Sequence, residues 1–146
     1  MMQSFVYPAS LKPDKDDGGF IVRFVDLPEA ITQGADKEDA LREAADCLEE
    51  AVANRIAMDL PIPAPSRMKR GQHAVIVPAQ TAAKAALSIA IKDAGITKTE
   101  LAKRLRYDEK EVRRLLDPRH PSKLPRIEAA LSAVGQRLIV GLQAAA

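Results

Sequence analysis

The chain has 146 residues, a formal net charge of +2, 3% aromatic residues, no tryptophan and a single cysteine, Cys47. This length allows one ordinary domain or two small ones, and a single cysteine excludes an intrachain disulfide. The first residues lack the pattern of a secretory signal, and no apolar run approaches the ~20 residues of a membrane helix. We therefore expect a cytoplasmic protein with no membrane segment.

Charge is divided unequally along the chain. Residues 1–66 contain 6 Lys/Arg and 13 Asp/Glu, whereas residues 67–146 contain 16 and 7. The two halves therefore carry formal charges of −7 and +9. An acidic module joined to a basic one predicts two partners of opposite charge, and nucleic acid is the usual partner of a basic module. Because aromatic residues are few, each small core would also gain from burial in an oligomer.

The first third of the chain predicts three short strands. Residues 5–7 are β-prone, and Pro8 is expected to interrupt them. Residues 14–19 combine aspartates with two glycines and predict a turn. Residues 20–25 alternate in polarity and predict a strand with one strongly apolar face, and residues 30–34 predict a weaker third strand.

A helix and a last strand complete the acidic half. Asp36 is a good N-cap, because its carboxylate can accept from the backbone of the first helical turn. The expected buried stripe follows the 3,4 spacing of a helix: Leu41, Ala44, Ala45, Leu48, Ala51, Val52 and Ile56. The proline-rich residues 60–66 cannot continue a helix and predict an extended connector. Residues 73–77 then predict a strand that returns to the sheet.

Catalytic chemistry has little support in this half. The aspartates that might converge at strand ends are Asp14, Asp16, Asp17 and Asp26. We interpret them as turn residues, because a divalent metal site needs several convergent oxygens. His73 and His120 have no evident nucleophile as a partner, and acidic neighbours should raise the pKa of Cys47. We expect no enzymatic activity, no metal site and no cofactor.

The basic half predicts a bundle of helices. Residues 80–94 have an apolar face at helical spacing, and Gly95 is placed to end that helix. Thr97 is a good N-cap for a second helix, and Glu100 would complete a capping box with it.

Two more helices and a tail follow. Asp108 can cap a third helix, which Asp117 and Pro118 stop. A fourth helix has its expected core positions at Leu124, Ile127, Ala130, Leu131 and Val134. Residues 137–142 predict either a last strand or an apolar tail that pairs with another subunit.

Residues 98–117 match the helix-turn-helix pattern at its structural positions. Ala102 is the small residue that lets the two helices approach, and Val112 and Leu115 form the core side of the recognition helix. Arg106 stands where this motif usually has glycine in a left-handed turn, a conformation that costs other residues about 1–2 kcal/mol. Either the turn is strained or its geometry differs.

The helix-turn-helix match of residues 98–117 predicts a set of DNA-contacting residues on and near the recognition helix. They are Lys98, Thr99, Asp108, Glu109, Lys110, Arg113 and Arg114. Arginines on such a helix read guanine, and residues at helix ends hold phosphates. An ordinary solvated helix face explains such a charge run equally well by itself. The helix-turn-helix frame favours binding of double-stranded DNA.

An ordered series of short motifs resembles the HicB antitoxin family of bacterial toxin–antitoxin modules. The motifs are Tyr7-Pro8-Ala9, Gly18-Gly19-Phe20-Ile21-Val22-Arg23-Phe24, Asp26-Leu27-Pro28, Thr32-Gln33-Gly34, Glu38-Asp39-Ala40-Leu41 and Pro63-Ala64-Pro65-Ser66. The C-terminal half resembles the helix-turn-helix subgroup of this family. Two positions depart from the pattern: Val25 stands where the family often has proline, and Glu29 where it often has glycine.

The resemblance implies an α+β fold. A partial ribonuclease-H-like, toxin-binding domain would occupy residues 1–78, and an all-α, helix-turn-helix DNA-binding domain residues 79–146. It also implies a partner, a small basic HicA-type toxin that acts as an mRNA interferase. The protein would neutralise this toxin and, as a homo-oligomer (dimer or tetramer), repress its own operon at operator DNA. Two alternatives stay open, a stand-alone transcriptional repressor with a ligand-sensing N-terminal domain and a nuclease that uses the acidic strand ends.

Overall fold

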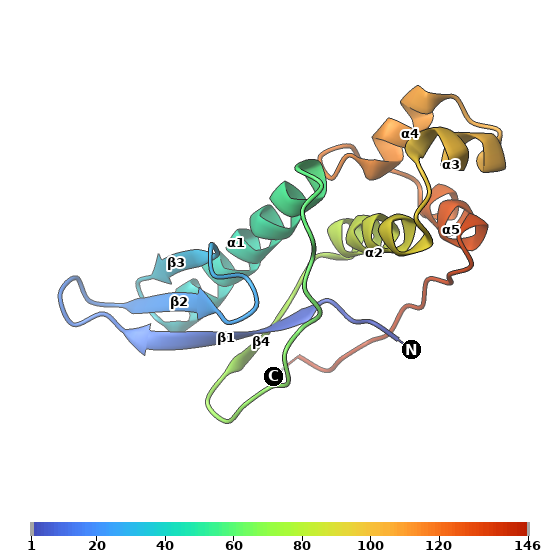
Figure 1. Cartoon of the computed structure of the whole chain (residues 1–146). Helices are drawn as coiled ribbons and strands as arrows, with labels where there is room; N and C mark the ends of the chain where they lie inside the picture. Colours follow the sequence, from blue (N-terminus) through green and yellow to red (C-terminus); the bar gives the residue numbers. More distant parts are fainter. Residues whose placement is uncertain (1, 146) are drawn as a thin grey trace.

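The computed structural model describes residues 2–145, which form an α+β fold with a sheet-and-helix part followed by a helical part (Figure 1). The strands pair antiparallel in the order β3-β2-β1-β4. The elements along the chain are β1 (Val6–Pro13), β2 (Phe20–Phe24), β3 (Ile31–Gly34), α1 (Lys37–Ala57), β4 (His73–Ile76), α2 (Ala79–Ala94), α3 (Lys98–Leu105), α4 (Glu109–Leu116) and α5 (Leu124–Ala133). The predicted order of strands and helices is confirmed.

Strand β1 continues through Pro8, so the predicted interruption is wrong. The Val77 N–H donates to the Phe5 carbonyl at 3.0 Å, which places the backbone groups of Phe5, Tyr7 and Ala9 toward β4. The nitrogen of Pro8 therefore faces the β2 side, where pairing begins only at Ala9 opposite Phe24. Its missing N–H costs no ladder hydrogen bond, and a proline is tolerated there.

Helix α1 covers one face of the sheet (Figure 1) and begins as predicted. The Asp36 carboxylate accepts from the Asp39 N–H at 2.8 Å. The buried stripe is rotated from its predicted position, because Ala40 is buried whereas Leu41 is only half-buried. The cause is a close approach to β3: a Cβ added to Gly34 would lie 2.2 Å from the Ala40 nitrogen. Ala44, Leu48, Val52 and Ile56 are buried as expected.

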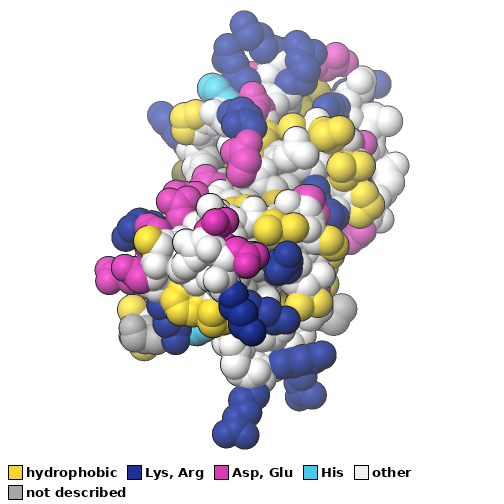
Figure 2. Space-filling view, turned by 90° about the vertical axis from the view of Figure 1, so that its left-hand side faces the viewer, with side chains coloured by type: hydrophobic (Ala, Val, Ile, Leu, Met, Phe, Trp, Pro, Cys, Tyr) yellow, Lys and Arg dark blue, Asp and Glu magenta, His cyan; other side chains and the backbone are white. Residues whose placement is uncertain are grey.

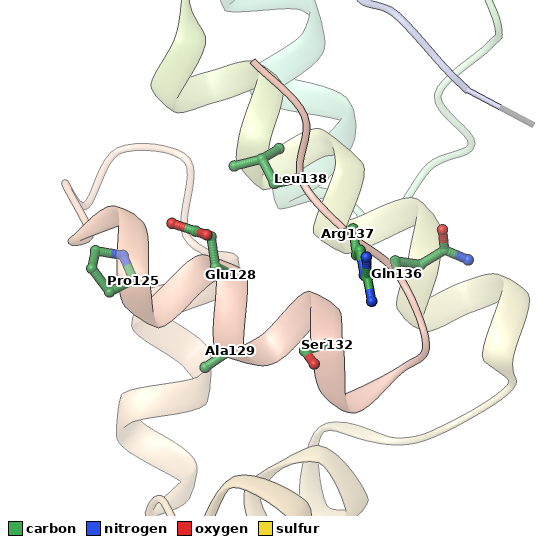
Figure 3. Close-up of a pocket in the computed structure, with 7 residues that line it drawn as sticks. All are labelled: Pro125, Glu128, Ala129, Ser132, Gln136, Arg137 and Leu138. Carbon is green, nitrogen blue, oxygen red and sulfur yellow. The ribbon is translucent and has the colours of Figure 1, made fainter.

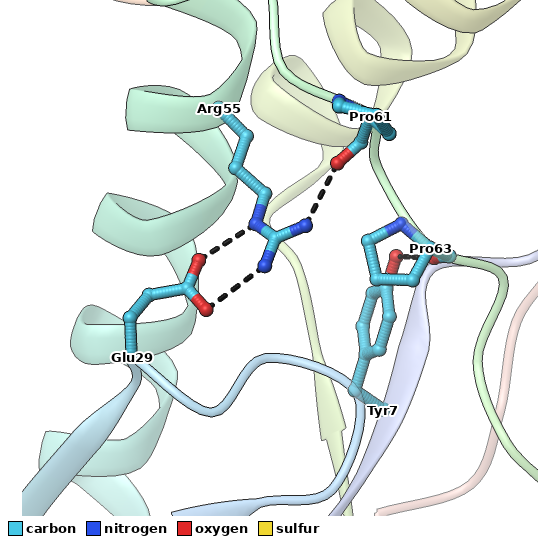
Figure 4. A network of polar contacts seen from close by, with 5 residues as sticks. All are labelled: Tyr7, Glu29, Arg55, Pro61 and Pro63. Carbon is cyan, nitrogen blue, oxygen red and sulfur yellow. Dashed lines mark hydrogen bonds and ion pairs between the residues drawn. The ribbon is translucent and has the colours of Figure 1, made fainter.

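The proline-rich connector after α1 lies against the sheet, anchored by the side chains of Tyr7 in β1 and Arg55 in α1 (Figure 4). The Tyr7 hydroxyl donates to the Pro63 carbonyl at 2.7 Å. Arg55 donates to both carboxylate oxygens of Glu29, at 2.6 and 2.9 Å, and to the Pro61 carbonyl at 2.8 Å. Glu29, which stands where the family often has glycine, therefore has a partner on α1, Arg55.

Capping residues delimit the helices of the second part. Gly95 ends α2 with a left-handed φ of 65°, and the Thr97 hydroxyl accepts from the Glu100 N–H at 3.1 Å, both as predicted. The second half of the predicted capping box is wrong, because the Glu100 carboxylate accepts from Arg104 instead. A complete capping box is found at α4, where Asp108 and Glu111 exchange hydrogen bonds of 2.8 and 3.1 Å.

The end of the chain differs from its predictions at two points. Leu124, expected in the core, is 44% exposed, because α5 turns Ile127, Ala130 and Leu131 inward. Residues 136–145 form no strand, so that alternative is wrong. Leu138 packs against the helical core, whereas the apolar side chains beyond it are exposed: Ile139 by 67%, Val140 by 78% and Leu142 fully.

Helix α2 belongs to both hydrophobic cores. Ala85 is buried in the core between the sheet and α1, with Ala82 and Ile89 packed beside it. The opposite side of α2 contributes to the second core, with Ala83, Leu87, Ala90 and Ile91. The two parts therefore share one helix as their common wall. Within residues 2–145, no helix has the length and apolar character needed to cross a membrane.

Candidate nucleic-acid interface

The turn between α3 and α4 has the left-handed geometry of a helix-turn-helix. Arg106 adopts φ 56° and ψ 38°. The Tyr107 N–H donates to the Ala102 carbonyl at 3.0 Å, and the Arg106 N–H donates to the Lys103 carbonyl at 3.3 Å. These bonds form a Schellman motif, which satisfies carbonyls at the end of α3. The motif geometry is thus retained without the usual glycine, at the conformational cost of a non-glycine residue.

The inward side of this unit is apolar, as its sequence predicts. Val112 and Leu115 of α4 are 0% and 2% exposed, and Leu101 and Ala102 of α3 are buried in the same core. The opposite side of α4 is left to solvent.

Three of the predicted DNA-contacting residues also have partners inside the chain. Asp108 caps α4 through its hydrogen bond from the Glu111 N–H. The Thr99 hydroxyl donates to the Glu109 carboxylate at 2.9 Å and joins the first turns of α3 and α4. These bonds explain the three residues as parts of the helix-turn-helix frame.

The other four predicted residues are exposed cations. Lys110, Arg113 and Arg114 lie on the solvent side of α4, and Lys98 begins α3. Among residues 2–145, no ion pair joins any of the four to a carboxylate. The structure therefore brings together a set of open positive charges on one short helix and the start of its neighbour.

Charged side chains are distributed unevenly over the molecular surface. Figure 2 shows Lys and Arg side chains gathered at the upper end of the molecule, the end that carries α3 and α4 in Figure 1. Asp and Glu side chains are concentrated nearer the middle (Figure 2). A second group of Lys and Arg side chains lies at the lower end, and the exposed Arg67, Lys69 and Arg70 belong to the connector that reaches it.

Lys84 of α2 is a site residue that the sequence-based set does not include. Its side chain is 0% exposed, and its ammonium group lies within hydrogen-bond distance of four oxygens, from Arg114, Asp117, His120 and Ser122. Burial lowers the pKa of Lys84, and the charge of Asp117 opposes part of this shift. The available signal was a polar stripe at helical spacing, Thr81, Lys84 and Ser88, whose last two members interrupt the apolar run from residue 82 to residue 91.

Part of the opposite charge of the two halves is neutralised within the chain. Arg119 pairs with Glu50 at 2.6 Å, and the Thr81 hydroxyl donates to Glu49 at 3.3 Å. Lys92 donates to the Asp59 carbonyl at 2.6 Å and lies 3.3 Å from its carboxylate. The C-terminal half of α1 thus contacts the basic half through its own acidic residues.

The aspartates considered for catalysis have local roles. Asp14 accepts from the N–H groups of Asp16 and Asp17 in its own loop, and Asp26 accepts from the backbone and hydroxyl of Ser66. No group of three or more His, Cys, Asp or Glu residues within 2–145 is placed to hold a metal ion. Burial raises the pKa of the Cys47 thiol, so the predicted direction is confirmed, although desolvation is the cause.

An open groove of about 480 Å³ separates the outer face of α5 from the segment that follows it (Figure 3). Its lining residues are Pro125, Glu128, Ala129, Ser132, Gln136, Arg137 and Leu138. This lining combines the apolar Pro125, Ala129 and Leu138 with polar and charged side chains, and it has the open shape of a surface groove.

Comparison with known proteins gives one consistent family. A family model described as the HicB-like antitoxin of a bacterial toxin–antitoxin system matches residues 6–86. Antitoxin HicB 1 of Photorhabdus laumondii subsp. laumondii is 35% identical over 143 residues, covering 98% of this chain and 90% of that protein. Antitoxin HicB of Escherichia coli K12 is 36% identical over 132 residues, covering 90% and 95%. Antitoxin HicB of Pseudomonas fluorescens is 32% identical over 146 residues, covering 99% and 100%. The chain therefore belongs to the HicB-like antitoxin family.

Proposed function

We propose that the protein neutralises a HicA-type mRNA interferase and represses its own operon by binding operator DNA. In this proposal residues 1–78 bind the toxin and residues 79–146 bind DNA. The observation that carries the DNA-binding role is the helix-turn-helix frame, with Val112 and Leu115 buried on one side of α4 and Lys110, Arg113 and Arg114 open on the other. A recognition helix needs this division between a packed face and a reading face.

The acidic outer face of α1 supports the toxin-binding role. Asp39, Glu43, Asp46 and Glu50 follow one another at spacings of 4, 3 and 4 residues, which places them along one side of the helix. A basic toxin would be attracted to this side at long range, whereas apolar contacts would have to supply the lasting affinity.

A homo-oligomer follows from the demands of DNA recognition. Two-fold proteins with this motif read half-sites about 34 Å or a multiple apart, because a single recognition helix contacts few bases. The exposed Ile139 and Val140, beside the groove along α5, supply apolar surface that another subunit would bury. We propose a dimer or a tetramer with two or more recognition helices.

The test is co-expression with a small basic open reading frame adjacent to this gene. We expect the full chain to restore growth, to co-purify with the toxin, and to retard a DNA fragment from the upstream promoter. Purified protein with Mg²⁺ or Mn²⁺ should leave RNA intact, because the proposed role is inhibition and not cleavage. DNA retardation without an adjacent toxin gene would favour the stand-alone repressor, and RNA cleavage abolished by Asp26→Asn would favour the nuclease.

A further inference from the structure

The ammonium group of Lys84 lies among oxygens that come from one stretch of the chain. Its three N–H donors are shared among four oxygens: the carbonyls of Arg114 at 2.9 Å and Asp117 at 2.7 Å, the Ser122 hydroxyl at 2.9 Å, and the His120 carbonyl. Lysines are almost never fully buried without partners, yet this one is 0% exposed. Its partners all belong to the last turn of α4 and the segment leading to α5.

This placement adds a charged donor at a helix end whose carbonyls otherwise have one backbone partner each: Arg114 accepts from the Asp117 N–H at 3.2 Å, and Asp117 accepts from the His120 N–H at 3.1 Å. The last carbonyls of a helix have no partner within it, and the C-terminal end of its dipole is negative. A lysine suits the position because its compact ammonium carries donors on a long flexible stem. An apolar side chain of similar length would fill the space and leave the Arg114 and Asp117 carbonyls without that donor.

A second contact from the same helix fixes the same segment. Gln80, one turn before Lys84, donates to the Ser122 carbonyl at 3.1 Å and accepts from the Ser122 N–H at 3.0 Å. Helix α2 therefore holds residues 114–122 at two successive turns, through hydrogen bonds to the end of α4 and to the segment after it.

We infer that Lys84 is the positioning residue for α4, and that its contact with the end of this helix sets where Arg113 and Arg114 lie. Arg114 shows the link directly, because its carbonyl is held by Lys84 while its side chain is exposed. Helix α4 has only eight residues, with Val112 and Leu115 as its buried anchors. Base recognition tolerates errors of only about 0.5 Å in the reading groups, so a displaced end of α4 weakens it. The inference rests on the proposed DNA-binding role.

The experiment compares Lys84→Met with Lys92→Met in the full chain. Both variants remove one lysine charge from α2, but Lys92 contacts Asp59 and not α4. Binding to the promoter fragment and to a random duplex is measured by fluorescence anisotropy, at a temperature where circular dichroism shows both variants folded. Amide hydrogen exchange of residues 114–122 is measured on the same samples.

Lys84→Met should lose about tenfold in promoter affinity, the change that follows loss of one base contact. Its affinity for the random duplex should fall much less, because its exposed phosphate-binding cations remain, and exchange should accelerate at residues 114–122. Lys92→Met should match the wild type in both assays. If Lys84 contributed only to overall stability, Lys84→Met would lower the melting temperature and leave the ratio of promoter affinity to random-duplex affinity unchanged.

Two results distinguish a failure of the positioning role of Lys84 from a failure of the proposed operator binding. A wild-type chain that binds promoter and random duplex equally overturns the proposed operator recognition. A wild type that discriminates, with a Lys84→Met variant that discriminates equally well, overturns the positioning role alone. If Lys84→Met fails to fold, Gln80→Ala replaces it as the test variant. Gln80 is exposed, and its substitution removes two hydrogen bonds to Ser122 in the same segment. The promoter-to-random ratio of this variant should fall in the same direction, and an unchanged ratio rejects the inference.

Discussion

Glu50 of α1 and Arg119 of the segment after α4 form an ion pair of 2.6 Å between residues 69 positions apart in the chain. A second residue of the acidic face, Asp39, is paired with Arg42 at 2.6 Å. Glu43 and Asp46 lie between them, exposed, and no ion pair within residues 2–145 includes either. A basic partner that approaches α1 therefore meets Glu43 and Asp46 as its open charges.

Neutralising these two residues together, as Glu43→Gln with Asp46→Asn, should slow association with the toxin several-fold at low ionic strength. The difference should shrink in physiological salt, where charges beyond ~8 Å are screened. The matched comparison is between the single variants Glu43→Gln and Glu50→Gln, and the effect of Glu50→Gln should be smaller because Arg119 already neutralises that charge. Stopped-flow association rates check this, and equal slowing by the two single variants would contradict it.

Replacing Arg113 and Arg114 by alanine should weaken operator binding and leave toxin binding unchanged. Both side chains are exposed on α4, so truncation spares the core. A base-reading arginine should cost ~1–3 kcal/mol and relax the sequence preference, whereas a phosphate contact should reduce the salt dependence. Titrations at several salt concentrations distinguish the two roles, with the exposed pair Arg67→Ala and Arg70→Ala, outside α4, as the control. Unchanged affinity in the double variant would remove α4 from the DNA interface.

Arg106→Gly should stabilise the helical part. Arg106 has a φ of 56°, and glycine adopts this left-handed conformation without the cost that a side chain adds. The substitution should therefore raise the free energy of unfolding by about 1 kcal/mol. The control is Lys103→Gly, an exposed position inside α3, which should lower the free energy of unfolding by about 1 kcal/mol. Urea unfolding of both variants measures the two changes. A destabilised Arg106→Gly would show that the arginine side chain outweighs its backbone conformation.

The Glu29–Arg55 pair should make stability depend on pH. The Arg55 guanidinium holds the pKa of Glu29 below its usual value, so the folded chain favours the charged carboxylate. That contribution is present above the ordinary glutamate pKa and is lost as the pH falls through the lowered one. Glu29→Gln should therefore destabilise by up to about 1 kcal/mol at pH 7, the range of exposed pairs.

The wild-type advantage over Glu29→Gln should shrink as the pH falls below the ordinary glutamate pKa of about 4.3, and it should disappear once the pH lies below the lowered pKa of the folded chain, where the carboxylate is protonated. Thermal unfolding at pH 7 and at pH 3 measures the difference, with Glu43→Gln as a control for loss of an acidic side chain. A constant difference at both values would show that the amide disturbs packing rather than charge.

A fragment ending at residue 94 should be more stable than one ending at residue 78. Ala82, Ala85 and Ile89 of α2 pack against the core of the sheet and α1, and the family match also continues to residue 86. The shorter fragment would expose that surface and should need the bound toxin to stay folded. Melting temperatures of the two fragments, with and without toxin, test the boundary. Equal values would support a separate domain ending at residue 78.

The sequence by itself determined the element order and most helix ends. Asp36, Gly95, Thr97 and Asp108 were predictable as caps, because a cap depends on residues only a few positions away. The outward face of α4 was predictable for a similar reason, since helical periodicity separates Arg113 and Arg114 from Val112 and Leu115.

Only the tertiary structure decided features that depend on which segments meet. Pro8 fits inside β1 because β2 pairs only from Ala9 onward, and α1 buries Ala40 because Gly34 admits its backbone. The bond from Lys84 to Arg114 spans 30 positions, and the one from Arg119 to Glu50 spans 69. Local propensity carries no information about such contacts, because their energy arises only when folding brings distant donors and acceptors within hydrogen-bond distance.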